Sequence, residues 1–123
     1  MSAPPSQPRP PAVSTRQAFS GGNEEHQSGT LYITVLRQTY TATGSGKLSP
    51  HMRAKPWLNI QLQSAPPEFN SDTTKYTCGT GTTFDFNITL KSIEYGVPLP
   101  MGEYVFAYEA RIVDYPPFQL PSP

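Results

Sequence analysis

The sequence is poor in charge, cysteine and histidine, and each shortage excludes a class of protein. Charged residues are 15% of the 123 residues, with nine basic and nine acidic side chains, so a strongly basic nucleic-acid binder is disfavoured. The single cysteine cannot form an internal disulfide, and with two histidines it cannot complete a zinc site unless carboxylates join them. Disulfide-stapled scaffolds and zinc modules are therefore excluded.

Long apolar runs are also missing. No segment approaches the roughly 18 apolar residues of a membrane span. The first residues lack the basic patch and apolar stretch of a secretory signal, so we expect an intracellular protein. The chain length predicts one domain.

Proline, in contrast, is abundant, with 15 residues. Residues 1–28 contain five of them and few bulky apolar side chains, which predicts a flexible arm. Two PxxP matches in this arm, at residues 5–8 and 8–11, fit the polyproline II ligands of aromatic grooves, although a plain tail is the simpler interpretation. Residues 115–123 form a second proline-rich tail, and the domain is expected to span residues 29–114.

In the part of the chain between the two tails, apolar and polar residues alternate with the period of a β-strand, and no window has a helical period. This pattern predicts a long bent strand and three further strands, at residues 30–43, 57–63, 83–93 and 104–113. The last two are expected to pair around a structured loop. A shorter strand is expected near residues 75–78, and any helix within residues 49–54. The fold class is therefore all-β, a small antiparallel β-sandwich or partial barrel with flexible proline-rich arms.

The same alternation predicts the core, because it assigns one inward face to each strand. The side chains expected to be buried are Leu58, Ile60, Leu62, Phe84, Phe86, Ile88, Leu90, Tyr104, Phe106 and Tyr108.

Candidate catalytic groups are sparse. Residues 44–49 resemble part of a phosphate-binding loop, but Leu48 stands where a hydroxyl is needed, so a hairpin loop is the preferred interpretation. A nucleophile would need Cys78 with His26 or His51 as its base, and the carboxylates form no close pair. We therefore expect no enzyme, no cofactor and no small-molecule substrate.

Charge is divided unevenly along the chain. Residues 26–67 contain four cations and no acid, whereas residues 68–114 contain three cations and seven acids. Such a chain could attract copies of itself, unless strand pairing interleaves the two halves. Four residues of the first half, Lys47, Arg53, Lys55 and Trp57, define a basic loop that could contact RNA phosphates or an anionic bilayer weakly, or simply be solvated.

The C-terminal tail contains the most specific string, Tyr115-Pro116-Pro117-Phe118-Gln119-Leu120. It resembles the YPxxxL late-domain motif of retroviral Gag and some viral matrix proteins. The resemblance covers six residues and implies that Tyr115 and Leu120, supported by Pro116 and Phe118, dock on a host budding adaptor. The open alternative is that Tyr115 and Phe118 pack back on the domain.

A second resemblance concerns the strands. Residues 29–35 resemble the opening strand of C2 domains, and residues 84–88 resemble a later one. This likeness implies a lipid-binding module, but the three aspartates lie too far apart in sequence for calcium loops.

These observations favour a non-enzymatic structural or assembly protein, of the viral matrix-like, capsid or accessory kind. We expect it to associate with itself and, through its proline-rich arms, with other proteins, in a host cytoplasm or a virion. The alternative is a cellular β-sandwich adaptor or a C2-like lipid-binding module.

Overall fold

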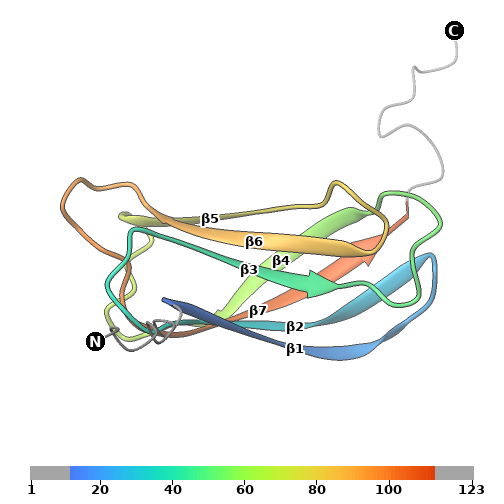
Figure 1. Ribbon diagram of the computed structural model, residues 1–123, viewed down its shortest axis with the longest axis horizontal. Coiled ribbons are helices and arrows are strands. Elements are labelled where there is room, and N and C mark those ends of the chain that lie inside the picture. The colour runs from blue at the N-terminus through green and yellow to red at the C-terminus, as the bar shows by residue number, and fades with distance from the viewer. Residues whose placement is uncertain (1–11, 113–123) are drawn as a thin grey trace, which may run out of the picture.

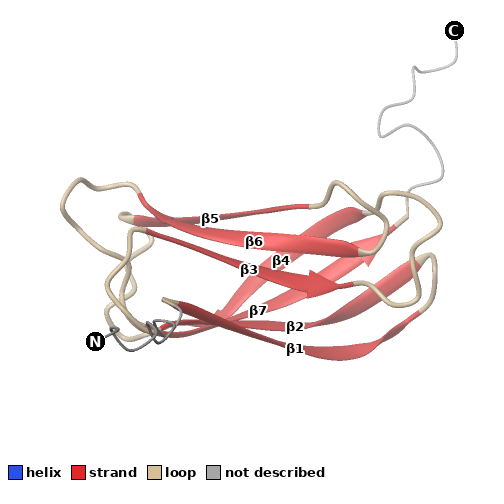
Figure 2. Cartoon of the chain, viewed as in Figure 1, coloured by secondary structure: helices blue, strands red, loops and turns tan. Residues whose placement is uncertain are grey.

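The computed structural model describes residues 12–112 of the chain. In this range the chain forms seven β-strands and no helix, and the strands lie in two layers (Figure 1, Figure 2). Their bounds are β1 Val13–Gly22, β2 His26–Val35, β3 Thr41–Lys47, β4 Trp57–Ser64, β5 Thr74–Gly79, β6 Asp85–Ser92 and β7 Gly102–Arg111.

The strands form a four-stranded sheet with the order β1-β2-β7-β4 and a three-stranded sheet with the order β3-β6-β5. All neighbouring strands are antiparallel. The predicted fold class, an all-β antiparallel sandwich, is confirmed, and the short strand expected near residues 75–78 is β5. The described residues contain no helix able to span a membrane. Residues 1–11 of the predicted N-terminal arm, the last two residues of the predicted domain (113–114) and the predicted C-terminal tail (115–123) lie outside the described range.

The structure differs from the sequence expectation at the N-terminal arm, which was predicted to extend to residue 28. Strand β1 and the first residues of β2 lie inside this range, so a flexible arm there is wrong for residues 13–28. Strand β1 can form with few apolar side chains because it is an edge strand that pairs with β2 through its backbone. Only Val13, Gln17 and Gly21 of β1 are partly buried.

Two connections that cross between the sheets change the predicted strand pairing. Residues 36–40 carry the chain from β2 to β3 in the other sheet, so the single bent strand predicted over residues 30–43 is two strands. Residues 93–101 carry the chain from β6 to β7 in the same way, so these strands do not form the predicted pair. Alternation gives the face of each strand but not its neighbour, which depends on the path of the loops.

The segment predicted as the place of a short helix, residues 49–54, is a loop. The buried side chain of Gln27 holds it in place. Gln27 Nε2 donates a hydrogen bond to the carbonyl of Pro50 (2.7 Å), and the amide of Ser49 donates to Gln27 Oε1 (2.9 Å). These bonds satisfy the backbone of the loop without a helix.

The core lies between the two sheets, and it contains most of the residues predicted from the alternation. Its largest buried side chains are Tyr104, Phe86, Phe106, Leu31, Ile33, Leu48, Ile88, Leu90 and Leu99. Phe84 is wrongly predicted: it is 40% exposed, because it precedes β6 and stacks on His51 outside the core. Three further predicted core residues, Leu58, Ile60 and Leu62, are only partly buried.

Two glycines explain why residues 44–49 are neither a phosphate loop nor a hairpin loop. Gly44 and Gly46 lie within β3, on its inner face. A Cβ atom on Gly44 would lie 2.7 Å from Cγ1 of Ile33, and one on Gly46 would overlap the ring of Phe86. The glycines therefore let β3 approach the core closely.

Candidate functional site

The most distinctive surface is one end of the sandwich, where residues 36–40, 65–73 and 93–101 meet. Two backbone hydrogen bonds join these loops, Leu99 N to Thr39 O (2.8 Å) and Ile93 N to Thr73 O (2.8 Å), and a third joins the last residue of β6 to the first loop, Ser92 N to Tyr40 O (2.9 Å). Because the loops hold one another by their backbones, this end is a preorganised platform rather than a set of independent loops.

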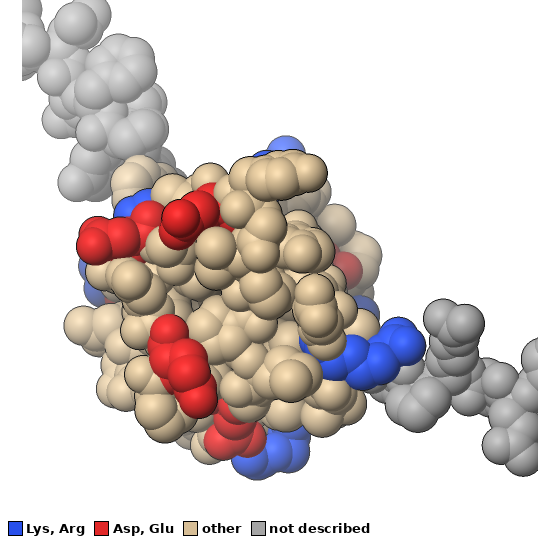
Figure 3. All heavy atoms as spheres, turned by 90° about the vertical axis from the view of Figure 1, so that its left-hand side faces the viewer, with Lys and Arg blue, Asp and Glu red and all other residues tan. Residues whose placement is uncertain are grey.

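Large apolar side chains are exposed on this platform. They are Leu36, Tyr40, Ile93, Tyr95 and Met101, and we call this surface the apolar loop end. Three of them, together with Ser92, Glu94 and Gly96, line a cleft of about 590 Å³. Figure 3 looks onto this end and shows a broad uncharged area with acidic and basic side chains around it.

Tyr95 is the most exposed of these side chains, and the turn around it explains why. Gly96 has a φ of +81°, a conformation that side-chain-bearing residues rarely adopt. The amide of Val97 donates to the carbonyl of Glu94 (3.1 Å), which closes the turn. Tyr95 therefore stands at the tip with its ring entirely in solvent.

Tyr104 anchors the platform to the core. Its hydroxyl donates a hydrogen bond to the carbonyl of Pro100 (2.6 Å), while its ring is buried and packs edge-on against Phe69. Burial, with a smaller contribution from the negative charge of Glu68, raises the pKa of Tyr104 to about 12. The phenol is therefore neutral and able to donate this bond at any ordinary pH.

The predicted basic loop lies at the opposite end of the sandwich. Lys47 ends β3 opposite Asp85 of β6, and Arg53 forms an ion pair with Glu25 (3.2 Å). Trp57 begins β4 and is 62% exposed. The strand order also interleaves the two halves of the chain, since β7 of the acidic half lies between β2 and β4 of the basic half and β6 pairs with β3, as one of the two interpretations of the charge division predicts.

A shallow hollow of about 290 Å³ lies beside Trp57, on the outer face of the four-stranded sheet, and is lined by Asn59, Glu109 and Arg111 as well. Glu109 accepts hydrogen bonds from His26 Nε2 (2.8 Å) and from Arg111 (3.1 Å). The bond from His26 is the main cause that lowers the pKa of Glu109. These charges satisfy one another, so the hollow offers no concentrated charge to a ligand.

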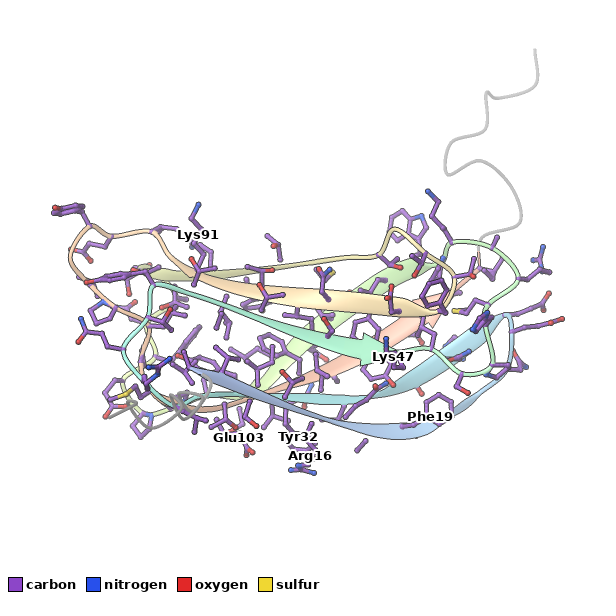
Figure 4. All side chains as sticks on the ribbon, in the orientation of Figure 1. Arg16, Phe19, Tyr32, Lys47, Lys91 and Glu103 are labelled. Carbon is purple, nitrogen blue, oxygen red and sulfur yellow. The ribbon has the colours of Figure 1, made fainter. Side chains whose placement is uncertain are left out.

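Other polar groups on the outer faces are separated. Figure 4 shows that Arg16, Tyr32 and Glu103 project from the four-stranded sheet, whereas Lys91 projects from the three-stranded sheet on the other side of the molecule. The guanidinium carbon of Arg16 lies 3.8 Å from the ring centre of Tyr32, a cation–π contact.

The candidate nucleophile of the sequence is not assembled into a catalytic group. Cys78 Sγ is 3.7 Å from the carbonyl oxygen of Leu58, and burial raises the pKa of its thiol. His51 stacks on Phe84 and His26 contacts Glu109. Residues 12–112 also contain no group of three histidine, cysteine or acidic side chains placed to hold a metal ion.

The predicted partner-binding residues of the tail, Tyr115, Pro116, Phe118 and Leu120, lie outside the described residues. Comparisons of the chain with protein-family models, with curated proteins and with solved structures found no match.

Reasoning from sequence missed the apolar loop end. A signal was present, since residues 93–102 combine Ile93, Tyr95 and Met101 with two glycines and two prolines. Loops with this turn chemistry are usually polar on the outside, so apolar residues there are a hint of an interaction surface. The contribution of Leu36 and Tyr40 could not be foreseen, because it depends on two loops far apart in sequence lying side by side.

Proposed function

We propose that this chain is a non-enzymatic assembly protein that docks on partner proteins through its apolar loop end. The observation that carries the proposal is the cleft of about 590 Å³ between Tyr40, Ile93 and Tyr95, set in loops that are hydrogen-bonded to one another. Exposed apolar groups that form a patch are typical of interaction sites.

Rigidity and side-chain type both favour this role. Tyrosine is one of the residues that contribute most to protein–protein binding, because a large ring loses little conformational entropy when it docks. The platform is already ordered by its backbone hydrogen bonds, so little additional entropy is lost on binding.

The charge beside the cleft indicates the chemistry of the partner. Glu94 lies between Ile93 and Tyr95 and lines the cleft with them. A partner that buries these apolar side chains must also accommodate the carboxylate, and a lysine or arginine does so best. We therefore expect a protein surface that offers an apolar anchor next to a cation.

A random peptide library displayed on phage provides a probe for this chemistry. Selection on the immobilised protein, with counter-selection on the Tyr95→Asp variant, should enrich sequences in which an aromatic or aliphatic residue neighbours lysine or arginine. Tyr95 is fully exposed, so the substitution should not perturb the fold. If the enriched peptides bind the Tyr95→Asp variant as well as the unmodified protein, the apolar loop end is not their binding surface.

A C2-like lipid-binding module is the second candidate, because exposed Tyr95, Ile93 and Met101 could also enter a membrane interface. Glu94 disfavours this function, since insertion would bury its charge. The test uses Tyr95→Trp in a Trp57→Phe background, with phosphatidylcholine vesicles with and without phosphatidylserine and calcium. We expect unchanged fluorescence; a blue shift with vesicles would favour the lipid module.

The narrower proposal, a viral matrix-like, capsid or accessory component, rests on the YPxxxL string of the tail. Tyr115→Ala combined with Leu120→Ala should abolish binding to a budding adaptor that recognises this motif. Binding by the double variant at the original affinity would remove the viral interpretation and leave the apolar loop end unaffected.

A further inference from the structure

Strand β4 has a free edge whose hydrogen-bonding groups can be assigned. Along an antiparallel strand, the backbone groups of successive residues point alternately to one neighbouring strand and to the other. The amide of Ile112 donates to Glu25 O just beyond the paired ends of β7 and β2, so the backbone groups of the even-numbered residues of β7 point to β2 and those of the odd-numbered residues point to β4. In the register with β7, Trp57, Asn59 and Gln61 of β4 then bond to β7. The backbone groups of Leu58, Ile60 and Leu62 point away from the sheet, and the contact of Leu58 O with the thiol of Cys78 confirms this direction.

This edge lacks the devices that normally prevent strand addition. Natural edge strands carry lysine, proline or inward charges, or they are covered by another element. Strand β4 contains no charged residue and no proline, and within residues 12–112 no further strand pairs with it. Its single irregularity lies at its end, between Leu62 and Ser64.

The side chains of this edge are also incompletely covered. Leu58, Ile60 and Leu62 face the core side, but they remain only partly buried because the sheet above them has three strands and ends at β5. An additional strand beside β4 would remove more of their apolar surface from water.

We propose that the occupant of this edge is β4 of a second copy of this chain, paired antiparallel about Ile60. In this register the outward-pointing backbone groups of Leu58 meet those of Leu62 in the other copy, with Leu58 O accepting through the lone pair that the Cys78 thiol leaves unused, and Ile60 meets its own counterpart. The two four-stranded sheets then form one continuous sheet of eight strands around a two-fold axis.

Self-complementarity of the strand is what favours a second copy over another protein. Opposed pairs on the inner face are aliphatic with aliphatic, and on the outer face Asn59 meets Gln61, so that every pair is compatible and no like charges meet. The inference specifies one partner of the proposed assembly protein, but it rests on a surface different from the apolar loop end.

Disulfide trapping reads out this register directly. Asn59 and Gln61 are exposed, and a cross-strand pair of this kind has Cα atoms about 4.5 Å apart, within the range that a disulfide accepts. We therefore consider two single variants, Asn59→Cys and Gln61→Cys, each in a Cys78→Ala background, which removes the thiol without adding a stronger donor to Leu58 O. In the mixture, the covalent heterodimer should form about tenfold faster than the covalent homodimer of either variant alone. In a homodimer the two cysteines occupy the same position in both copies, and these positions are diagonal neighbours about 7–8 Å apart.

A matched control uses Thr43→Cys with Ser45→Cys, which occupy the exposed face of β3 and should not crosslink in the mixture. Sedimentation of the unmodified protein should show a concentration-dependent dimer. Equal crosslinking of the mixture and the single variants, or a monomer at every accessible concentration, would overturn the proposal. Repeating the mixture with Tyr95→Asp in both chains separates the two surfaces, since the crosslink should persist even if the apolar loop end loses its partner.

Discussion

The two long sides of the sandwich are closed in different ways. On one side, between β1 and β3, Gln17 Nε2 donates to Lys47 O (2.7 Å) and the amide of Lys47 donates to Gln17 Oε1 (2.7 Å). On the other side, between β4 and β5, Cys78 Sγ lies 3.7 Å from Leu58 O. We call these the closed side and the open side.

The comparison teaches how a small sandwich controls its edges. A side-chain amide has a donor and an acceptor, so Gln17 imitates one residue of a neighbouring strand and occupies the edge of β3. The thiol of Cys78 is a weak donor and leaves the second lone pair of Leu58 O free. Gln17 therefore occupies the edge groups of β3 at Lys47, whereas on the open side the Cys78 thiol occupies one lone pair of Leu58 O.

Core substitutions should give the largest difference between the two sides. Phe86 is buried against β3 on the closed side, and Phe86→Ala should lower the free energy of unfolding by about 3–5 kcal/mol. Leu62→Ala on the open side should cost less than about half of that, because Leu62 is only partly buried. Urea denaturation measures both values, and equal losses would show that the open side is packed as tightly as the closed side.

The glycines should give the next largest difference. Gly46→Ala forces a Cβ into the ring of Phe86 and should cost about 1–3 kcal/mol. The matched variant is Gly79→Ala in β5, where an added Cβ has no atom within 4 Å, so its effect should be within about 0.5 kcal/mol of zero. A harmless Gly46→Ala would mean that β3 has room to move away from the core.

Removal of the edge contacts tests the comparison itself. Gln17→Ala leaves the amide and carbonyl of Lys47 without their partner and should cost about 1–2 kcal/mol. Cys78→Ala should cost less than about 1 kcal/mol, because the thiol is a weak donor. Gln17→Ala should also expose the edge of β3 and increase self-association in sedimentation experiments; stability and association equal to those of the unmodified protein would contradict the role of Gln17.

The smallest effect concerns pH at the apolar loop end. The pKa of Tyr104 rises from 10 to about 12 on folding, chiefly through burial, so its contribution to stability is complete below pH 10 and is lost as pH rises towards 12. Tyr104→Phe lacks this titration and should show a flatter decline of the urea midpoint above pH 10. Parallel declines for the two proteins would assign the alkaline sensitivity to other groups.

The sequence predicts where the strands of this molecule lie better than it predicts which strands pair with one another. Alternation located β4, β6 and β7 because each has one apolar face. It could not locate β1, whose stability depends on backbone pairing with β2 rather than on apolar side chains. The sequence predicts a loop for the GSGK string of β3, because the reasons for its glycines come from other strands: Ile33 lies against Gly44, and the ring of Phe86 lies against Gly46.

The candidate surfaces were harder to predict than the strands. Trp57 was singled out for its place in a basic loop, but the structure shows that Glu25 and Asp85 accompany the cations there. The apolar loop end depends on three loops that are joined only in the folded chain. The free edge of β4 depends on sheet order, which a period of two does not determine.

The path of the chain through the four-stranded sheet has a mechanical consequence. Strand β1 begins at the end of the sandwich where β2 finishes, β7 finishes at the opposite end, and both strands pair with β2. A tensile force applied at Val13 and Arg111 would slide β1 and β7 in opposite directions along β2, so many ladder hydrogen bonds would bear the load together instead of opening one at a time. The fold is thus arranged to resist pulling along its long axis, and its lifetime under load would be set by the rate of unfolding rather than by the equilibrium.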